Sequence, residues 1–267
     1  MGERLQPSSL DEYLSVSQHL RELFLRPSPS GAEKGVRLYC RTVVEDCGFQ
    51  ADQDAKGNLI AWRGEKDTQS TLLTAHMDTP QQIRDVQVMA RLGGAALALP
   101  EKDGITQVLG QDDQGETVCI GADDKCGLAI ILAIAELTDL CFKVLLTVEQ
   151  GNEGAGCKAV DAAFYTGLEA CLALDQPGNA AIVSACSQRA LASDWFVDRL
   201  VSLSKEMGLG YWWAEGASVD AHTISRHVPQ VVALSVGFGS YPSAAADYAV
   251  MIDTVHAMRL VTAHLTQ

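Results

Sequence analysis

Short apolar runs alternate with helical patterns from residue 117 to the end of the chain, and this alternation constrains the fold more than any other sequence feature. The apolar runs are too short for helices, and the segments between them carry apolar residues at helical spacing. The expected elements are strands at 117–120, 142–148, 170–174 and 231–236 and helices at 124–137, 158–164, 191–207 and 254–265. Strands that alternate with helices predict an α/β fold whose central sheet is mostly parallel and carries helices on both faces.

The first part of the chain adds elements of both kinds. A Ser-x-x-Glu pattern at 9–12 and another at 30–33 each predict the N-terminus of a helix. The further expected elements are helices at 9–25 and 30–47, strands at 58–62 and 71–75, and weak strand signals near 97 and 108 within an irregular stretch from 81 to 114. Because no internal repeat or linker interrupts the 267 residues, we expect residues 1–267 to form a single domain.

The charge and the cysteines restrict partners and location. Lysine and arginine number 20 and aspartate and glutamate 34, a net charge of −14, which argues against nucleic acid and anionic membrane surfaces. The longest apolar stretch, 127–135, is shorter than the ~18 residues of a membrane span, and the N-terminal stretch has no apolar signal region. The eight cysteines form no C-x-x-C pair and lie mostly in apolar runs, as buried free thiols do. We therefore expect a cytoplasmic protein.

Candidate chemistry gathers where the expected strands end. His76 and Asp78 follow the strand at 71–75, and Asp123 and Asp124 follow the strand at 117–120. Ligands of open α/β sheets bind at the carboxyl ends of strands. Each pair alone has an ordinary structural explanation, such as a hydrogen-bonded His–Asp pair or a helix N-cap.

Two further strands also deliver polar residues at their ends. Glu149 and Gln150 follow the strand at 142–148, and Asp175 follows the strand at 170–174. One imidazole with several carboxylates is a donor set that Zn²⁺, Mn²⁺ or Co²⁺ accepts. The sequence therefore predicts a metal site at this edge of the sheet.

Other hydrolase chemistry has little support in the sequence. No G-x-S-x-G nucleophile elbow occurs, and phosphate-binding loops and dinucleotide fingerprints are absent. Cys126 lies near an expected helix start, but no histidine partner is indicated, so we interpret it as a buried thiol.

The runs LLTAHMDTP, IGADDKCGLAIILA and LLTVEQ resemble the zinc-dependent exopeptidases with cocatalytic metals, most of all the tripeptide aminopeptidase relatives. PSPSGAEKGVRLYCRTVVEDCGF and DAKGNLIA also fit, whereas HVPQVVALSVGFG fits more loosely. The resemblance implies that His76, Asp123 and Asp175 are zinc ligands, with Asp123 bridging two metals. It further implies that Asp78 orients His76, and that Glu149 is the general base.

The sequence departs from this family at two ligands of the same metal. Gln150 stands where the family has a carboxylate, and an uncharged amide is a weak zinc ligand. The last histidine of the family is replaced by Tyr241 or Ser243, depending on alignment. We therefore expect one zinc per chain, held by His76, Asp123 and Asp175.

Alternatives for the second site remain open in the sequence. A shifted alignment would let Glu153 supply the missing carboxylate, and His222 or His227 could reach the site from the segment GASVDAHTISRH. The 44 residues between Asp175 and Asp220 leave no room for the lid domain that the family usually inserts there.

Two functions follow from the resemblance and its gaps. The first is a metal-dependent exopeptidase-like hydrolase, an aminopeptidase on small peptides, with N-acyl amino acids as a second substrate class. The second is a relative without catalysis that binds a peptide, small molecule or partner protein. The sequence does not predict the oligomeric state.

Overall fold

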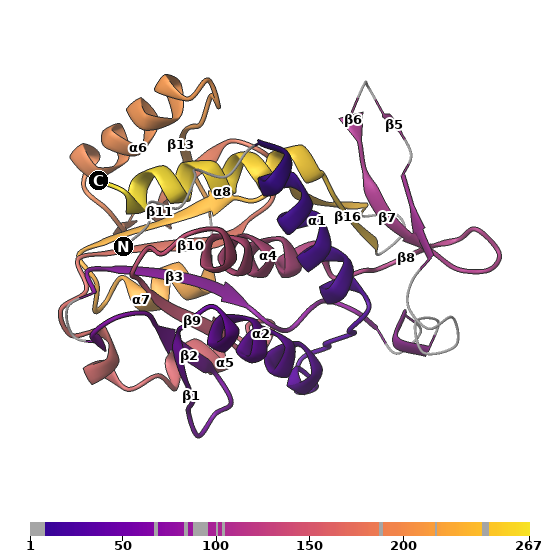
Figure 1. Cartoon of the computed structure of the whole chain (residues 1–267), viewed down its shortest axis with the longest axis horizontal. Helices are drawn as coiled ribbons and strands as arrows, with labels where there is room; N and C mark the ends of the chain where they lie inside the picture. The colour runs from indigo at the N-terminus through magenta and orange to yellow at the C-terminus, as the bar shows by residue number, and fades with distance from the viewer. Residues whose placement is uncertain are drawn as a thin grey trace.

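A computed structural model describes residues 9–66, 69–82, 85–87, 96–99, 101–102, 105–186, 189–216, 218–241 and 246–267. Figure 1 shows a mixed sheet crossed by helices, with a smaller set of strands to one side. Among the described helices, none combines the length and apolar character needed to cross a bilayer.

The central sheet has a parallel middle and antiparallel edges. Its order is β1-β2-β9-β3-β10-β14-β11-β12, with β13 also paired to β11. Its strands are β1 (Gln50–Gln53), β2 (Leu59–Trp62), β3 (Thr71–His76), β9 (Lys143–Thr147), β10 (Ala170–Gln176), β11 (Ala181–Cys186), β12 (Arg189–Ala190), β13 (Trp212–Glu215) and β14 (Gln230–Ser235). Strands β9, β3, β10 and β14 run parallel to one another, whereas β2 pairs with β9 and β14 with β11 in the antiparallel sense. The prediction of a mostly parallel α/β sheet is confirmed.

A second sheet lies beside the first (Figure 1). Its order is β15-β16-β7-β4, with β8 also paired to β7, and a separate pair joins β5 to β6. The strands are β4 (Ala96–Ala98), β5 (Glu101–Lys102), β6 (Ile105–Thr106), β7 (Val108–Gln111), β8 (Thr117–Val118), β15 (Phe238–Tyr241) and β16 (Ala246–Ala249). The weak strand signals near residues 97 and 108 correspond to β4 and β7.

One face of the central sheet is covered by the long helices. They are α1 (Ser9–Phe24), α2 (Lys34–Asp46), α4 (Ala122–Leu137), α6 (Asp194–Glu206) and α8 (Met251–Leu265). Helix α4 packs on β3 and β10 and is itself covered by α1, α2 and α8. Its apolar run, 127–135, is almost completely buried, which explains why the sequence shows no polar face there.

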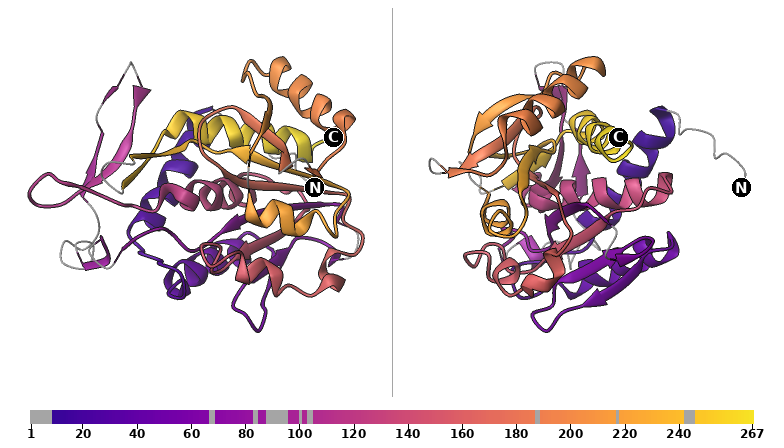
Figure 2. Two further views of the ribbon diagram at one scale, coloured as in Figure 1. Left: turned by 180° about the vertical axis from the view of Figure 1, so that it is seen from behind. Right: turned by 90° about the vertical axis from the view of Figure 1, so that its left-hand side faces the viewer.

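The opposite face carries shorter helices and a smaller core (Figure 2). They are α5 (Ala155–Lys158), the 3₁₀ turn η2 (Ala162–Tyr165) and α7 (Val219–Ile224). The predicted continuous helix at 158–164 is wrong, because Asp161 breaks it. This residue has an extended backbone and its side chain accepts the backbone N–H of Ala163, which begins the 3₁₀ turn.

The second predicted helix begins later than its Ser-x-x-Glu pattern indicates. Glu33 is the N-cap residue of α2 and makes no side-chain capping bond. The Ser30 hydroxyl instead donates to Asp78 at 2.6 Å, so the capping-box interpretation of 30–33 is wrong. All eight cysteines are free thiols, as predicted, and five of them are buried.

Candidate metal centre

The predicted metal ligands come from neighbouring parts of the fold. His76 is the last residue of β3, and Asp175 lies near the end of the adjacent parallel strand β10. Asp123 lies in the first turn of α4, which packs against both strands. Parallel strands end at the same edge of the sheet, so the topology brings these three side chains together.

The three side chains meet at the imidazole of His76. Its Nε2 atom lies 3.0 Å from Asp123 Oδ1 and 3.4 Å from Asp175 Oδ1. The His76 and Asp175 side chains are only 5% and 9% exposed, whereas that of Asp123 is 37% exposed. Burial lowers the pKa of His76, but its bonds to Asp123 and Asp175, with further help from Asp78, outweigh burial and hold this pKa well above its usual value. Two acceptors thus face the same imidazole nitrogen.

Asp78 holds the other side of the imidazole mainly through its backbone. His76 Nδ1 lies 2.8 Å from the Asp78 carbonyl oxygen and 3.6 Å from the Asp78 carboxylate. The carboxylate itself accepts the backbone N–H groups of Gln150 (2.8 Å) and Gly151 (3.0 Å), besides the Ser30 hydroxyl. Asp78 therefore connects the histidine to the loop after β9.

A further carboxylate, that of Asp124, lies close to His76 and Asp175. Ligand-capable atoms of His76, Asp124 and Asp175 all lie within 4.8 Å of one another. Both Asp124 oxygens already accept backbone N–H groups, Oδ2 from His76 at 3.1 Å and Oδ1 from Gly127 at 3.0 Å. Asp124 is fully buried, and this burial raises its pKa. The group of mutually close donor atoms thus contains Asp124 and not the predicted ligand Asp123, whose side chain is the more exposed of the two.

Asp247, on β16 of the second sheet, binds the turn that carries Asp123. Its Oδ1 accepts the backbone N–H groups of Ile120 (2.8 Å) and Gly121 (3.3 Å). Its Oδ2 accepts those of Ala122 and Asp123, the latter at 3.4 Å. The carboxylate is 4% exposed, so four donors converge on one buried anion.

Lys125 binds the same turn through a backbone carbonyl group. Its fully buried ammonium group donates to the Ile120 carbonyl at 2.9 Å. Burial lowers the pKa of Lys125 to about 8, and the nearby Asp247 charge opposes this shift. The turn is thus held by an anion at its N–H groups and by an amine at one of its carbonyl groups.

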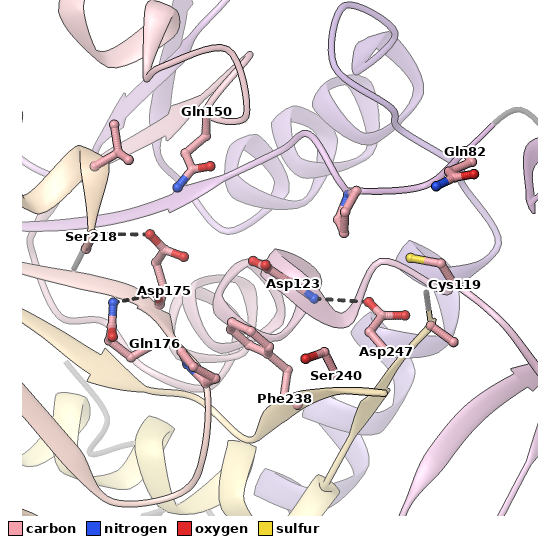
Figure 3. Close-up of a pocket in the computed structure, with 15 residues that line it drawn as sticks. Gln82, Cys119, Asp123, Gln150, Asp175, Gln176, Ser218, Phe238, Ser240 and Asp247 are labelled. Carbon is pink, nitrogen blue, oxygen red and sulfur yellow. Dashed lines mark hydrogen bonds between the residues drawn. The ribbon is translucent and has the colours of Figure 1, made fainter. Parts of the chain in front are cut away.

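A cavity of about 550 Å³ opens above the cluster. Its charged lining residues are Asp123, Asp175 and Asp247, and Figure 3 shows Gln150 extending toward it from the opposite wall. This volume lies within the range of small-molecule sites. No lysine or arginine lines the cavity among the residues that the structure describes.

Glu149, in the loop after β9, lies beside Lys56 and away from this cavity. Its carboxylate accepts from Lys56 Nζ at 2.7 Å and from Asn152 Nδ2 at 3.2 Å. It lines a separate polar cavity of about 230 Å³ with Lys56, and the lining of the 550 Å³ cavity does not include it. The hydrogen bond from Lys56 lowers the pKa of Glu149. The structure thus places Gln150, and not Glu149, toward the candidate metal ligands.

The alternative residues for a second metal take other positions. Glu153 is exposed and does not line the larger cavity. His227 stacks on Tyr165 with ring centroids 4.9 Å apart, and His222 lines a neighbouring cavity. Ser243 and the side chain of Tyr241 lie outside the described residues.

Sequence reasoning missed Asp247 and Asp220 as parts of this site. Asp220 is buried beside Thr147, whose hydroxyl donates to it at 2.6 Å, and burial raises its pKa to about 6. Ser218, two residues earlier, donates to Asp175 Oδ2 at 3.1 Å. The sequence does contain a signal for Asp247, which is the single acid in the apolar run AAADYAV. An apolar run predicts burial, and a buried acid is rarely without partners, so Asp247 could have been expected to bind polar groups.

The donor set fits a divalent metal ion. Carboxylate oxygens of Asp123 and Asp175 lie 3.0 and 3.4 Å from His76 Nε2, and both aspartates line the cavity. Catalytic zinc sites use three protein ligands of these types. The imidazole is also oriented through its second nitrogen, as metal-binding histidines are.

Comparison with known proteins identifies the fold. No protein-family model matches the sequence, and no curated protein is significantly similar to it. Aminopeptidase PepT from Bacillus cereus aligns with a TM-score of 0.75 at 15% identity, covering 96% of this chain and 99% of that one. A tripeptidase from Staphylococcus aureus gives 0.70 at 12% identity (96% and 99% covered). A TET aminopeptidase from a marine sediment archaeon of the Thaumarchaeota gives 0.70 at 12% identity (97% of each chain). The chain therefore has the α/β fold of these aminopeptidase and tripeptidase structures.

Proposed function

We propose that this protein is a metal-dependent hydrolase of the zinc exopeptidase kind, which removes the N-terminal residue of short peptides. The observation that carries the proposal is the approach of Asp123 and Asp175, which line the 550 Å³ cavity, to Nε2 of His76. These residues would hold one divalent ion, zinc in our proposal, with manganese or cobalt as alternatives. Such an ion polarises the scissile carbonyl group and makes water a stronger nucleophile.

The acidic lining of the cavity favours the amino end of a peptide. The metal ion would balance the charges of Asp123 and Asp175, so Asp247 supplies the remaining negative charge of the lining, and no described lysine or arginine there would attract a carboxylate. Asp175 is fixed by Ser218, and the turn with Asp123 is fixed by Asp247, so these groups are held in place before a ligand arrives. N-acyl amino acids, which lack an ammonium group, are the less favoured substrate class.

Glu149 is the proposed general base, and this role requires its carboxylate to leave Lys56. The ion pair is 2.7 Å long but partly exposed, with side chains 31% and 23% exposed. Exposed pairs contribute little to stability, so a bound substrate could replace Lys56 as the partner of Glu149. Glu149 would then take a proton from water and deliver it to the leaving amine.

A second function has its own supporting observation. Gln150 faces the cavity and Glu149 faces Lys56, an arrangement suited to a protein that binds peptides without hydrolysing them. In this case the metal cluster and the acidic cavity would hold the peptide, and no base would be needed.

Elemental analysis and a peptidase assay test these proposals on protein purified without chelator or metal-binding tag. We expect about one zinc per chain, as a three-ligand site allows, and release of the N-terminal residue from alanyl peptides. Glu149→Ala should abolish turnover while leaving metal content unchanged, whereas His76→Ala should lose the metal. Full activity in Glu149→Ala would refute the assigned base. Bound zinc and peptide binding without hydrolysis would favour the second function.

A further inference from the structure

A second cavity, of about 340 Å³, adjoins the cavity above the metal cluster. Ser218 and Val219, at the start of α7, line both cavities. The second cavity extends along α7 and is also lined by Lys158, His222 and Arg226. The two cavities are therefore neighbours that share the residues at the start of one short helix.

The charge of this cavity is opposite to that of its neighbour. Lys158 and Arg226 are both exposed, and neither side chain has a hydrogen bond or ion pair with another described residue. The Nδ1 atom of His222 is buried and has no hydrogen-bond partner. No aspartate or glutamate lines this cavity in the described part of the chain. Two unpaired cations without an acid are notable in a chain that has 34 acidic and 20 basic residues.

Paired cavities of opposite sign complement a molecule with a charge at each end. A short peptide carries an ammonium group at one end and a carboxylate at the other. If its amino end lies in the metal cavity near Asp247, its chain can pass Val219 and bring the carboxylate toward Arg226. Arginine and lysine bind carboxylates by charge-assisted hydrogen bonds, and arginine can do so through two parallel bonds.

We infer that Lys158, His222 and Arg226 form a subsite that binds the terminal carboxylate of a short peptide. This inference rests on the proposed function, because it needs the amino end of the peptide in the metal cavity. Val219 begins α7 and Arg226 lies two residues beyond its end, so the lining of the second cavity runs the length of this helix.

Calorimetric titration with trialanine and its C-terminal amide tests the subsite. The full chain carries Glu149→Ala, so that hydrolysis does not disturb the binding measurement. We expect trialanine to bind about tenfold more tightly than the amide, as loss of charge-assisted hydrogen bonds at a partly exposed site implies. Removing both cations (Lys158→Gln with Arg226→Gln) should make the two affinities equal. The matched control, Arg21→Gln with Lys205→Gln, removes the same charges from exposed positions outside both cavities and should keep the tenfold difference.

Three outcomes would overturn the inference. Equal binding of acid and amide by the parent would show that no carboxylate is recognised, and a difference that persists without Lys158 and Arg226 would place the recognition elsewhere. Inorganic phosphate that binds at these residues without competing with trialanine would identify a site for free anions. Because the readout is equilibrium binding, a tenfold preference together with absent hydrolysis would support the subsite and refute only the catalytic proposal.

Discussion

Replacing Asp247 by asparagine tests whether this residue positions the metal ligand Asp123. Each Asp247 oxygen accepts two backbone N–H groups of the turn at 120–123, and both oxygens are needed. An asparagine side chain has one carbonyl oxygen, so its NH₂ group must face two N–H donors in either orientation. The substitution thus removes the two hydrogen bonds of one oxygen, either those from Ile120 and Gly121 or those from Ala122 and Asp123.

The magnitude follows from these contacts. A hydrogen bond to a charged group contributes about 1.5–3 kcal/mol, so we expect Asp247→Asn to lower the free energy of unfolding by about 2–4 kcal/mol. The displaced turn should also weaken zinc binding by about 10- to 100-fold, as changes behind metal ligands commonly do. Competition with a chromophoric chelator measures the zinc affinity, and urea unfolding measures the stability at the same temperature.

Asp85→Asn is the matched control for this experiment. The Asp85 carboxylate is also buried and accepts two backbone N–H groups, from Gln82 at 2.8 Å and from Cys119 at 3.3 Å. It contacts the segment before the turn but not the turn itself, so its loss should reduce stability and leave zinc affinity nearly unchanged. Wild-type zinc affinity in folded Asp247→Asn, or an equal loss in both variants, would refute the positioning role.

Three further substitutions test other parts of the site. Gly127→Ala places a Cβ atom 2.1 Å from the Leu174 carbonyl oxygen and should cost about 3 kcal/mol in urea unfolding, whereas Gly35→Ala, with open space around it, should be neutral or stabilising. Burial raises the pKa of Asp220 from 3.8 to about 6, so its contribution to stability is present below pH 4 and lost as the pH rises through 6. In metal-free protein, Asp220→Asn should therefore raise stability at pH 7 by up to about 3 kcal/mol and flatten the pH dependence between 4 and 6; a less stable variant at pH 7 would contradict this. Gln150→Glu adds a carboxylate to the cavity and should raise the metal content toward two per chain by elemental analysis; Gln82→Glu, in the same lining, should not.

The residues that sequence reasoning could find are those that follow parallel strands. His76 and Asp175 end neighbouring strands, and Asp123 begins the helix that packs on both, so the alternation of elements already places them at one edge. Asp247 could not be placed in this way. It comes from an antiparallel strand of the second sheet, and 124 residues separate it from Asp123, so only the packing of the two sheets brings them together.

The sequence also could not predict the directions of the Glu149 and Gln150 side chains. Glu149 and Gln150 are adjacent, and the resemblance to zinc exopeptidases assigns the base to the first of them. The structure gives Glu149 a positive φ of 50° and pairs it with Lys56, which lies on the connection between β1 and β2. Neither the loop conformation nor this partner, 93 residues earlier, can be read from the local sequence.

Asp78 determines which of the two adjacent residues faces the metal ligands. Its carbonyl oxygen orients His76, and its carboxylate holds the backbone N–H groups of Gln150 and Gly151. With the backbone fixed there, Gln150 extends into the cavity, and Glu149 remains beside Lys56. A backbone rearrangement that exchanged the two residues would break both bonds to Asp78, whose hydrogen bonds to an anion are the stronger kind. Rotation of the Glu149 side chain away from the partly exposed Lys56 breaks only a weak ion pair. If the protein is a hydrolase, the base must therefore approach by side-chain rotation while the loop stays bound to Asp78.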